Sequence, residues 1–356
     1  MESIVLQRKE GRIEAILSNI EIPKINGKHI LVRVKCAGIC GTDLKLYTGQ
    51  YPVDDKVLPI VLGHEFVGEV IKIGENVTKV AIGDRVVATP SFTGCGRCRY
   101  CDRGEIKLCK TRKRMGFNCD GAFSEFVRLH EEQIFHIPNS ISDDAGAMIE
   151  PLSVAVSGVY KANIKPTDTI LVTGPGAIGL LTSLVAKQFG AKVILCGTDA
   201  DKSRLEIAKQ MGIDIIVLSR ELPIMLQSEK IIIDIVLECS GNAQAVNLGI
   251  DSIRPKGQFV QIGTTKKAVS INFMDIAYKE LMVTGSIGAL KEDWVVAIKL
   301  MEKIQTKALL IVKKHLPFKD FHKGFEECLN NGGPKILLTP TNSIGEYTQL
   351  MKTRMH

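Results

Sequence analysis

The sequence predicts an α/β protein with a β-rich part at its N-terminus and a doubly wound parallel sheet in its second half. Three observations support this prediction. Short β-branched runs separated by glycines continue to about residue 137, strands and helices alternate from Pro151 to about Leu290, and a glycine-rich loop follows the first alternating strand. Such alternation is typical of a parallel sheet with helices on both faces. A length of 356 residues favours two domains.

The composition is that of an ordinary globular protein, with 45% hydrophobic and 24% charged residues. The net charge of +7 is spread along the chain. The basic run from Lys107 to Arg114 is typical of a solvated loop edge, so we expect no nucleic-acid partner. The N-terminus lacks a signal pattern and no window approaches 18 uncharged apolar residues, so we expect no membrane association. Ten cysteines without an export signal favour a reducing compartment, and we expect the cytoplasm.

The first part is expected to consist of short strands joined by turns. Its runs are alternating or β-branched and are bounded by glycines, which is typical of a small all-β unit. The expected strands are 30–35, 67–73, 85–87, 121–127 and 133–137. Pro138 then opens a helical stretch, where Asp143 and Asp144 are favourable near the positive N-terminal end.

The loop from Ser91 to Cys109 carries four cysteines in a C-x2-C-x2-C-x7-C spacing: Cys95, Cys98, Cys101 and Cys109. Four thiolates this close suit one tetrahedral Zn²⁺ whose coordination positions are all filled by protein. A closed site has no position for a substrate, so we predict a structural metal. Iron–sulfur ligation uses similar thiolate runs, and unrelated cysteines or disulfides are further alternatives.

The second part is expected to alternate strands with helices. The expected strands are 169–173, 192–196, 215–217, 231–238, 258–262 and 281–285, and the expected helices include 178–189, 202–211 and 294–303. Gly174–Gly179 is a G-x-G-x-x-G loop directly after the first of these strands. Its glycines permit a tight turn, backbone approach to a pyrophosphate, and close packing of helix on strand. The residues of this predicted dinucleotide loop are Gly174, Gly176, Ala177, Ile178 and Gly179; a coincidental glycine turn is the alternative.

The end of the next strand bears on the choice of cofactor. It finishes with Thr198 and Asp199, and Asp199 lies 20 residues beyond Gly179. An acid at this distance accepts hydrogen bonds from the ribose hydroxyls of NAD. Lys202 and Arg204 follow closely and suit a 2′-phosphate, so NADP is the alternative to NAD.

Four residues form a second candidate metal centre: Cys40 in GICGTD, His64 and Glu65 in GHE, and Glu150 in IEPLSV. Singly, each has a structural explanation, since a lone cysteine is usually core and an acid before proline usually belongs to a turn. Together they offer one sulfur, one imidazole and two carboxylates, enough for a zinc site with an exchangeable position. An open Zn²⁺ lowers the pKa of an alcohol, so that nicotinamide can take a hydride.

These motifs occur in an order that resembles the zinc-dependent medium-chain dehydrogenases. GICGTD, GHE followed by FVGEV, the cysteine loop, the EPL junction and the dinucleotide loop follow one another between about residues 25 and 340. The resemblance implies a GroES-like catalytic domain with a Rossmann domain inserted before its C-terminal residues. We expect 1–153 to be the GroES-like domain with its zinc loop at 91–109, 154–292 the Rossmann domain, and 293–356 the return to the first domain.

The resemblance also implies roles for single residues. Cys40, His64 and Glu65 would hold a catalytic zinc, Glu150 would be an exchangeable ligand, and Thr42 would pass the alcohol proton toward the cofactor ribose. The resemblance implies two Zn²⁺ per chain. It also implies a dimer or homotetramer whose edge strands pair near residues 281–287. The residues implied along the cofactor, beyond the loop and Thr198, are Asp199, Arg204, Ile262, Gly263, Thr264, Ser286 and Ile287.

The GHE and EPL pairing is similar to the polyol and threonine dehydrogenase branch. The liver-type branch has a cysteine as third ligand, and Cys119, Cys196, Cys239 and Cys328 do not match that motif. Lys45 stands where several relatives have a histidine that ends the proton relay, so the relay is expected to end in water. GSIGALKEDW lacks the arginine–tyrosine pair that animal sorbitol dehydrogenases bring to the polyol.

We therefore predict a zinc-dependent oxidoreductase that transfers a hydride between NAD(P) and a secondary alcohol of a polyol or sugar-like small molecule, as sorbitol (L-iditol) dehydrogenases do. The enzymatic alternatives are L-threonine 3-dehydrogenase, 2,3-butanediol dehydrogenase and galactitol-1-phosphate dehydrogenase; basic residues at 112–114 suit a sugar phosphate. The alternative from another class is a catalytically silent cofactor-binding relative, which the intact ligand set disfavours.

Overall fold

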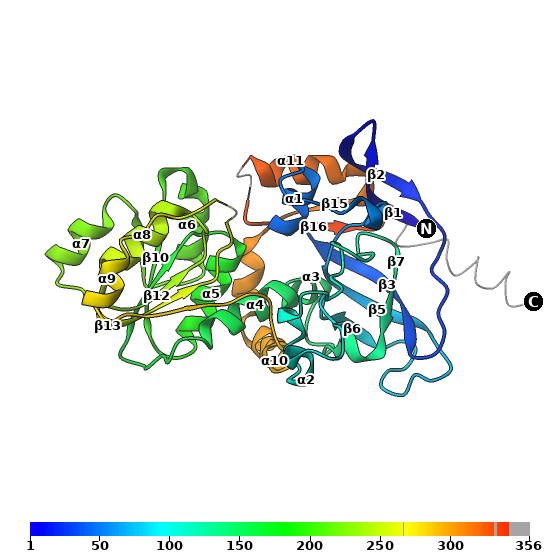
Figure 1. Ribbon diagram of the computed structural model, residues 1–356, viewed down its shortest axis with the longest axis horizontal. Coiled ribbons are helices and arrows are strands. Elements are labelled where there is room, and N and C mark those ends of the chain that lie inside the picture. The colour runs from blue at the N-terminus through cyan, green and yellow to red at the C-terminus, as the bar shows by residue number, and fades with distance from the viewer. Residues whose placement is uncertain (266, 331–332, 342–356) are drawn as a thin grey trace, which may run out of the picture. The chain divides into compact units, whose positions relative to one another are not determined.

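A computed structural model of the chain describes residues 1–265, 267–330 and 333–341, and it divides into two compact units (Figure 1). Among these residues, the first unit comprises 1–148, 314–330 and 335–341, and the second comprises 149–313 and 333–334. The chain thus enters the second unit at 149, where 154 was expected, and returns at 314 rather than 293. The later return has a physical reason, because α10 (Lys291–Ala308) packs against α4 (Ile149–Val159) and α5 (Ala177–Lys187) of the second unit.

The first unit is built from two sheets, in which β1 to β8 pair in antiparallel directions and β16 pairs antiparallel with β3. One has the strand order β2-β1-β4, and the other has the order β15-β16-β3-β5-β6-β8 with β7 also pairing with β3. Its strands are β1 (Glu2–Lys9), β2 (Arg12–Asn19), β3 (His29–Gly38), β4 (Ile60–Val61), β5 (Glu65–Ile73), β6 (Arg85–Ala88), β7 (Phe126–His130), β8 (Ile134–His136), β15 (Val312–Pro317) and β16 (Lys335–Thr339). Alternate apolar residues of these strands, such as Val32 and Phe66, meet in one buried core.

Short helices connect the strands of the first unit. They are α1 (Gly41–Tyr47), α2 (Arg99–Asp102), α3 (Asp143–Ala147) and α11 (Phe321–Leu329), with 3₁₀ helices η1 (Asp55–Val57), η2 (Ile106–Leu108), η3 (Glu131–Gln133) and η6 (Phe318–Asp320). The strand expected at 121–127 begins only at Phe126. The preceding segment instead runs along β4 and its continuation, where the Gly121 and Phe123 amides donate to the Val61 and Leu62 carbonyls, each at 2.8 Å.

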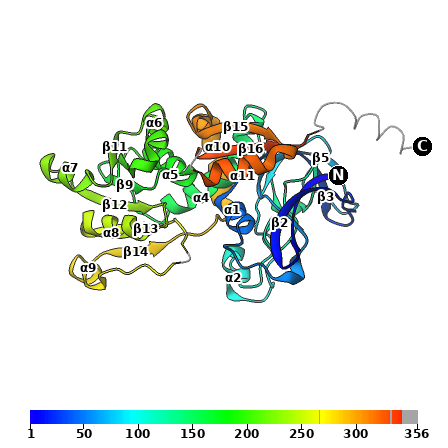
Figure 2. The same cartoon turned by 90° about the horizontal axis from the view of Figure 1, so that it is seen from above.

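The second unit contains a six-stranded parallel sheet with helices against it, which confirms the predicted doubly wound architecture (Figure 2). Its strands are β9 (Thr169–Thr173), β10 (Lys192–Gly197), β11 (Ile215–Leu218), β12 (Ile233–Glu238), β13 (Ile253–Gln261) and β14 (Met282–Gly285). Its remaining helices are α6 (Lys202–Gln210), α7 (Leu222–Ser228), α8 (Ala243–Ser252), α9 (Phe273–Tyr278), η4 (Asp199–Asp201) and η5 (Leu309–Ile311). The order β11-β10-β9-β12-β13-β14 is the Rossmann order 3-2-1-4-5-6.

The central strands of the second unit are buried beneath its helices. α5 and α6 pack against β9, β10 and β11, while α8 packs against β12 and β13. The central strands are therefore continuous apolar runs, as expected for parallel strands covered on both faces. Among the described residues, none of the helices combines the length and apolarity that a membrane crossing requires.

Candidate metal centres and cofactor site

The first candidate centre brings together three of the predicted ligands. One ligand atom each of Cys40, His64 and Glu65 lies within 4.8 Å of the other two. A zinc ion with bonds of about 2.0–2.3 Å can join atoms at such separations after small side-chain rotations. The donor set of thiolate, imidazole and carboxylate is also the chemistry that zinc prefers. The residues present therefore fit a zinc ion.

Local backbone structure explains how these three side chains converge. Cys40 caps the N-terminus of α1, and Glu65 begins β5 directly after His64. Gly38, at the end of β3, is the register partner of Glu65. A Cβ atom added to Gly38 would lie 2.5 Å from the Glu65 Oε2 atom, so this glycine makes room for the carboxylate. The GIC and GHE sequences thus form two sides of one site.

Asp43 organises the site although it was not among the predicted residues. Its side chain is fully buried, and its two oxygens accept hydrogen bonds from the Cys40 amide at 2.9 Å and the Gly63 amide at 3.2 Å. The same carboxylate lies 3.6 Å from the His64 Nδ1 atom. A carboxylate behind a metal-ligating histidine fixes the ring orientation and leaves its other nitrogen for the metal.

The charges of the site act on His64. Burial by itself lowers the pKa of this imidazole, but the neighbouring Cys40 thiolate and Asp43 carboxylate raise it well above its ordinary value. Without a metal, the negative groups around the ring therefore attract a proton. The same negative potential favours a divalent cation in this position.

Lys335 supplies a buried positive charge to the site and was also not predicted. Its Nζ atom donates to Glu65 Oε2 at 2.5 Å and to the Ile39 carbonyl at 2.9 Å, with both side chains almost completely buried. Burial lowers the pKa of Lys335, but Glu65 and Cys40 raise it above its ordinary value. No local pattern marks this pair, because 270 residues separate its members in the sequence.

The remaining predicted catalytic residues, Thr42 and Glu150, lie on two helices. Thr42 and Lys45 are half-buried in α1, which Cys40 caps. Glu150 belongs to the second unit, where it stands in the first turn of α4. The group formed by Cys40, His64 and Glu65 does not include it. Its role as a fourth ligand is therefore a prediction.

The four-cysteine loop forms the second candidate centre. The sulfur atoms of Cys95, Cys98, Cys101 and Cys109 all lie within 4.8 Å of one another. The distance from Cys98 Sγ to Cys101 Sγ is 3.6 Å, and that from Cys95 Sγ to Cys101 Sγ is 4.0 Å. A tetrahedron with Zn–S bonds of about 2.3 Å has edges of about 3.8 Å. The cluster therefore fits one zinc ion, and its sulfurs are too far apart for disulfides.

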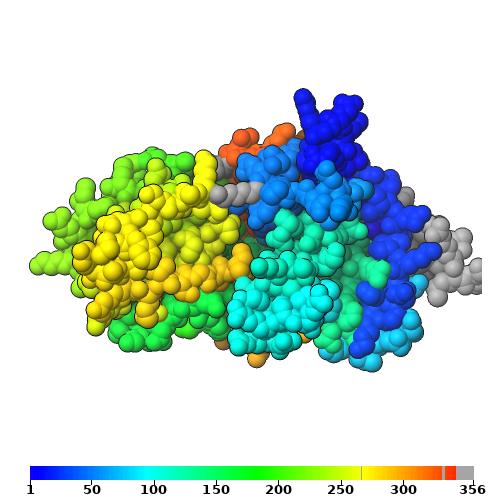
Figure 3. Space-filling view, in the orientation of Figure 1, coloured from blue at the N-terminus to red at the C-terminus, as the bar shows by residue number. Residues whose placement is uncertain are grey.

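Backbone hydrogen bonds in this loop lower the pKa of one of its thiols, that of Cys109. The Cys95 amide donates to the Cys109 sulfur at 3.4 Å, and together with Thr111 it lowers the pKa of that thiol to about 6. A thiol of low pKa is readily deprotonated, as metal ligation requires. The loop, which includes α2 and η2, lies at the surface of the first unit and shows as the cyan region of Figure 3.

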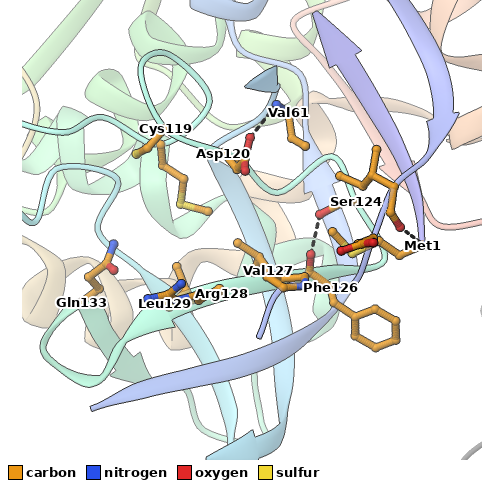
Figure 4. Close-up of a pocket in the computed structure, with 15 residues that line it drawn as sticks. Met1, Val61, Cys119, Asp120, Ser124, Phe126, Val127, Arg128, Leu129 and Gln133 are labelled. Carbon is orange, nitrogen blue, oxygen red and sulfur yellow. Dashed lines mark hydrogen bonds between the residues drawn. The ribbon is translucent and has the colours of Figure 1, made fainter. Parts of the chain in front are cut away.

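Cys119, which does not match the third-ligand cysteine of the liver-type branch, lines a separate cavity in the first unit. The cavity has a volume of about 250 Å³ and lies between the N-terminal strands and β7 (Figure 4). Cys119 and Asp120 are on its wall, and burial raises the pKa of the Cys119 thiol to about 11. Cys40, His64 and Glu65 do not line this cavity, so it is distinct from the candidate metal centre.

The glycine-rich loop occupies the predicted place in the second unit. It connects β9 to α5, and Gly176 caps the helix whose first residues are Ala177 and Ile178. A Cβ atom on Gly179 would lie 1.9 Å from the Gly174 carbonyl oxygen, which explains why only glycine fits there. The unpaired amides at the start of α5 form a site suited to a pyrophosphate.

Asp199 follows β10 but is not a free carboxylate. The guanidinium of Arg220 contacts its Oδ2 atom, and the Lys202 Nζ atom lies 3.3 Å from its Oδ1 atom. Arg220 follows the neighbouring strand β11 and was not predicted. The neighbouring Thr198 hydroxyl donates to Asp201 at 2.7 Å, and the Arg204 guanidinium lies 3.4 Å from the same carboxylate.

The remaining predicted cofactor residues line one cavity of the second unit. This cavity has a volume of about 570 Å³ and is mostly apolar, with walls from α8, α9 and the last two strands of the sheet. The predicted residues on its wall are Ile262, Gly263, Thr264, Ser286 and Ile287. They follow the carboxyl ends of β13 and β14, where open α/β sheets bind their ligands.

Comparison with known proteins matches both units. Residues 26–139 match the family model of the alcohol dehydrogenase GroES-like domain, and residues 177–303 match that of the zinc-binding dehydrogenases. Over 320 residues the chain is 38% identical to a sorbitol dehydrogenase of Halalkalibacterium halodurans, covering 88% of this chain and 92% of the relative. Over 340 residues it is 33% identical to a D-arabitol-phosphate dehydrogenase of Enterococcus avium, covering 94% and 96%.

A solved structure shows the same similarity in three dimensions. An alcohol dehydrogenase from Escherichia coli CFT073, complexed with NADH, has a TM-score of 0.85 and 27% sequence identity. The match covers 95% of this chain and 99% of that chain. It therefore includes both the β-rich unit and the unit with the parallel sheet.

Proposed function

This chain belongs to the zinc-dependent medium-chain alcohol and polyol dehydrogenases, as its motifs predicted, and from that membership we propose that it oxidises a secondary alcohol of a polyol or sugar-like substrate. In this reaction the alcohol loses a hydride to NAD(P)⁺ and a proton to solvent, giving a ketone and NAD(P)H. The observation that carries the proposal is the convergence of Cys40, His64 and Glu65.

The residues of the first unit suit the proton and oxygen chemistry of this reaction. A Zn²⁺ ion held by Cys40, His64 and Glu65 would supply a Lewis acid that lowers the pKa of a hydroxyl group. Asp43 keeps the His64 ring oriented for that role, since it lies behind the Nδ1 atom. We assign Thr42 to carry the hydroxyl proton away. Glu65 is assigned as the third protein ligand, and Glu150 as a carboxylate that exchanges with water or substrate.

Two zinc ions per chain are part of the proposal. The four-cysteine loop supports a closed structural ion, because its sulfurs have the spacing of one tetrahedral site. The mixed group around Cys40 supports a second ion, because its three protein ligands leave a position for substrate.

All ten cysteines lie in the described part of the chain and none forms a disulfide, which supports a reducing compartment such as the cytoplasm.

We propose NAD as the preferred cofactor, with NADP as a weaker alternative. Asp199 has the position of the acid that accepts from the ribose hydroxyls. Its contacts with Arg220 and Lys202 offset its negative charge, and the same cations can attract a 2′-phosphate. Because Asp199 favours NAD while Arg220 and Lys202 can attract NADP, we expect a moderate preference for NAD.

Asp199→Ala is therefore expected to raise the ratio of kcat/KM for NADP over NAD by about tenfold, because a like charge no longer opposes the 2′-phosphate. Arg220→Ala is the matched variant and is expected to shift the ratio in the opposite direction. Initial rates of cofactor reduction at saturating substrate measure both ratios. Unchanged ratios in both variants would mean that the ribose is recognised elsewhere.

We propose a homo-oligomer, a dimer or homotetramer, that pairs through β14. This strand is the edge of the parallel sheet, and its Met282 and Val283 side chains are 59% and 48% exposed. Ile287 beyond it and Tyr278 in α9 are exposed as well. An apolar edge strand with unpaired backbone groups is a template for pairing with a second chain.

A sugar phosphate is the second candidate substrate. One relative is a D-arabitol-phosphate dehydrogenase, and the chain carries a basic run at 112–114. The Arg114 guanidinium stacks 3.4 Å from the Phe117 ring centroid, and a Cβ atom on neighbouring Gly116 would lie within 2.6 Å of the Gly63 carbonyl, beside His64. Gly116, two residues beyond this run, therefore packs on the backbone of the residue before His64.

A substrate panel tests the proposed function. Polyols, their phosphates, L-threonine and 2,3-butanediol are each added with NAD or NADP, and reduced nicotinamide is followed by absorbance. Reduction with a polyol or its phosphate, together with two zinc ions per chain by elemental analysis, is the expected outcome. Turnover of L-threonine or butanediol alone would replace the substrate class. One zinc ion and no alcohol-dependent reduction would favour the catalytically silent relative.

A further inference from the structure

A third group of metal-ligating side chains lies apart from both zinc centres. It consists of Cys36 on β3, Asp144 in α3 and His315 on β15. One ligand atom from each residue lies within 4.8 Å of the other two, and the His315 Nε2 atom is 3.3 Å from the Asp144 Oδ2 atom. All three residues belong to the first unit, so the fold of one domain brings them together.

The accessibility of the group suits an ion that enters from solvent. The Cys36 side is closed, with only 2% of the residue exposed, whereas the His315 and Asp144 side chains are 47% and 40% exposed. An ion would therefore contact a buried sulfur on one side and two solvent-exposed ligands on the other. Water would fill the remaining position of a tetrahedral ion with three protein ligands.

The surrounding charges also favour a cation. The neighbouring Asp143 carboxylate pairs with the Arg85 guanidinium, whose nitrogen lies 2.6 Å from the Asp143 Oδ1 atom. The Asp144 carboxylate faces His315 instead. Burial, and then the carboxylates of Asp144 and Asp143, raise the pKa of the Cys36 thiol. A negative potential that disfavours a thiolate is relieved when a divalent cation binds beside it.

An ordinary surface ion pair is the alternative explanation for His315 and Asp144. The first unit contains such a pair in His136 and Asp84, whose Nε2 and Oδ2 atoms are 2.9 Å apart. That pair belongs to none of the three groups in the described residues whose ligand atoms could share an ion. The buried sulfur behind His315 and Asp144 is what distinguishes the two places.

We propose that Cys36, Asp144 and His315 form an additional binding site for a borderline-soft divalent cation such as Zn²⁺ or Co²⁺. Thiolate, imidazole and carboxylate together select such ions over Mg²⁺ or Ca²⁺, which prefer oxygen ligands. The site goes beyond the proposed catalytic function and does not depend on it. Because the ion would join β3, α3 and β15, its binding would tie the C-terminal return of the chain to the N-terminal sheet and stabilise the fold.

A cobalt titration of the zinc-loaded full chain tests this proposal. Cobalt bound to a thiolate gives a charge-transfer absorption band, and elemental analysis of the same samples shows whether the original zinc is retained. We expect one saturable equivalent of Co²⁺ with a thiolate band and no loss of zinc. We also expect an increase in Tm of about 2 °C or more when Zn²⁺ is added in excess.

Three variants separate the outcomes. Cys36→Ser should abolish the band, and His315→Ala should weaken cobalt binding at least about tenfold, with dehydrogenase turnover and the two zinc ions unchanged. His136→Ala is the control at a matched ion pair and should bind cobalt as the wild type does. His315 is exposed, so its replacement keeps the test valid even where Cys36→Ser folds poorly. Equal cobalt binding in wild type and His315→Ala, or no saturable equivalent in the wild type, would overturn the proposal.

Discussion

The two candidate zinc centres of the first unit differ in how the chain assembles them. The cysteine loop draws all four ligands from residues 95–109, whereas the open centre combines Cys40, His64 and Glu65 from the ends of α1 and β5. The loop positions its ligands largely through its own backbone, and the Cys95 amide stabilises the thiolate form of Cys109 by a hydrogen bond. The open centre needs the surrounding fold to supply Asp43 and Lys335.

This difference corresponds to the difference in their proposed roles. A site filled by four protein sulfurs contributes folding energy and leaves no position for a substrate. A site with three protein ligands must keep a position open, so its ligands are restrained from behind by buried partners instead. The Glu65 carboxylate shows this most clearly, since it has Lys335 as a partner when it is not bound to a metal.

Cys40→Ser is expected to have the largest effect on turnover. Loss of the thiolate removes a ligand from the proposed catalytic ion, and Lewis-acid stabilisation worth about 4 kcal/mol corresponds to a loss of about 10³-fold in kcat/KM. The melting temperature and nucleotide binding should remain close to wild type. Steady-state rates, thermal melts and zinc content measure these quantities.

Cys119→Ser is the matched control for this variant, because Cys119 lies in the separate cavity of the same unit. It should retain turnover and both zinc ions. Substantial activity in Cys40→Ser, with the zinc content unchanged, would contradict the assignment of the open centre.

Lys335→Met should reveal whether Glu65 exchanges between a lysine and a metal. In the metal-free protein the variant leaves a buried carboxylate unpaired, which costs about 3 kcal/mol in the free energy of unfolding. With zinc added the loss should be smaller, because the carboxylate gains the metal as a new partner. Urea denaturation with chelator and with zinc measures the two values.

Lys335→Arg serves as the control, since it keeps a positive charge beside Glu65. It should lose less stability than Lys335→Met in the metal-free protein. A loss in Lys335→Met that is the same with and without zinc would mean that Glu65 does not act as a ligand.

Most of the fold could be predicted from the sequence because its signals are local. The β9 strand at 169–173, the glycine loop and the following helix each have a pattern within about 20 residues, and the structure confirms that element order. The four cysteines are recognisable for the same reason. Cys40, His64 and Glu65 could be proposed because GICGTD and GHE occur in the order that resembles a known family, and the structure brings one ligand atom of each within 4.8 Å of the others.

The residues that the sequence did not reveal are those whose partners are distant. Lys335 pairs with Glu65 across 270 positions, and Arg220 reaches Asp199 from the end of a different strand. Asp43 lies within GICGTD, and its spacing of three from Cys40 is the spacing of a capping box at the start of α1. The later boundary at 314 likewise depends on α10 packing against α4, which no local pattern specifies.

Cys98→Ser should have the smallest effect on turnover and completes the comparison between the two centres. The substitution is chemically the same as that at Cys40, but here it breaks a closed site whose proposed ion stabilises the fold. We expect the zinc content to fall by one ion per chain and Tm to fall by about 5 °C or more. Turnover at low temperature should change by less than about twofold, because no atom of the loop belongs to the open centre. An unchanged melting curve, or a loss of turnover as large as that of Cys40→Ser, would show that the two centres do not divide structure and chemistry between them.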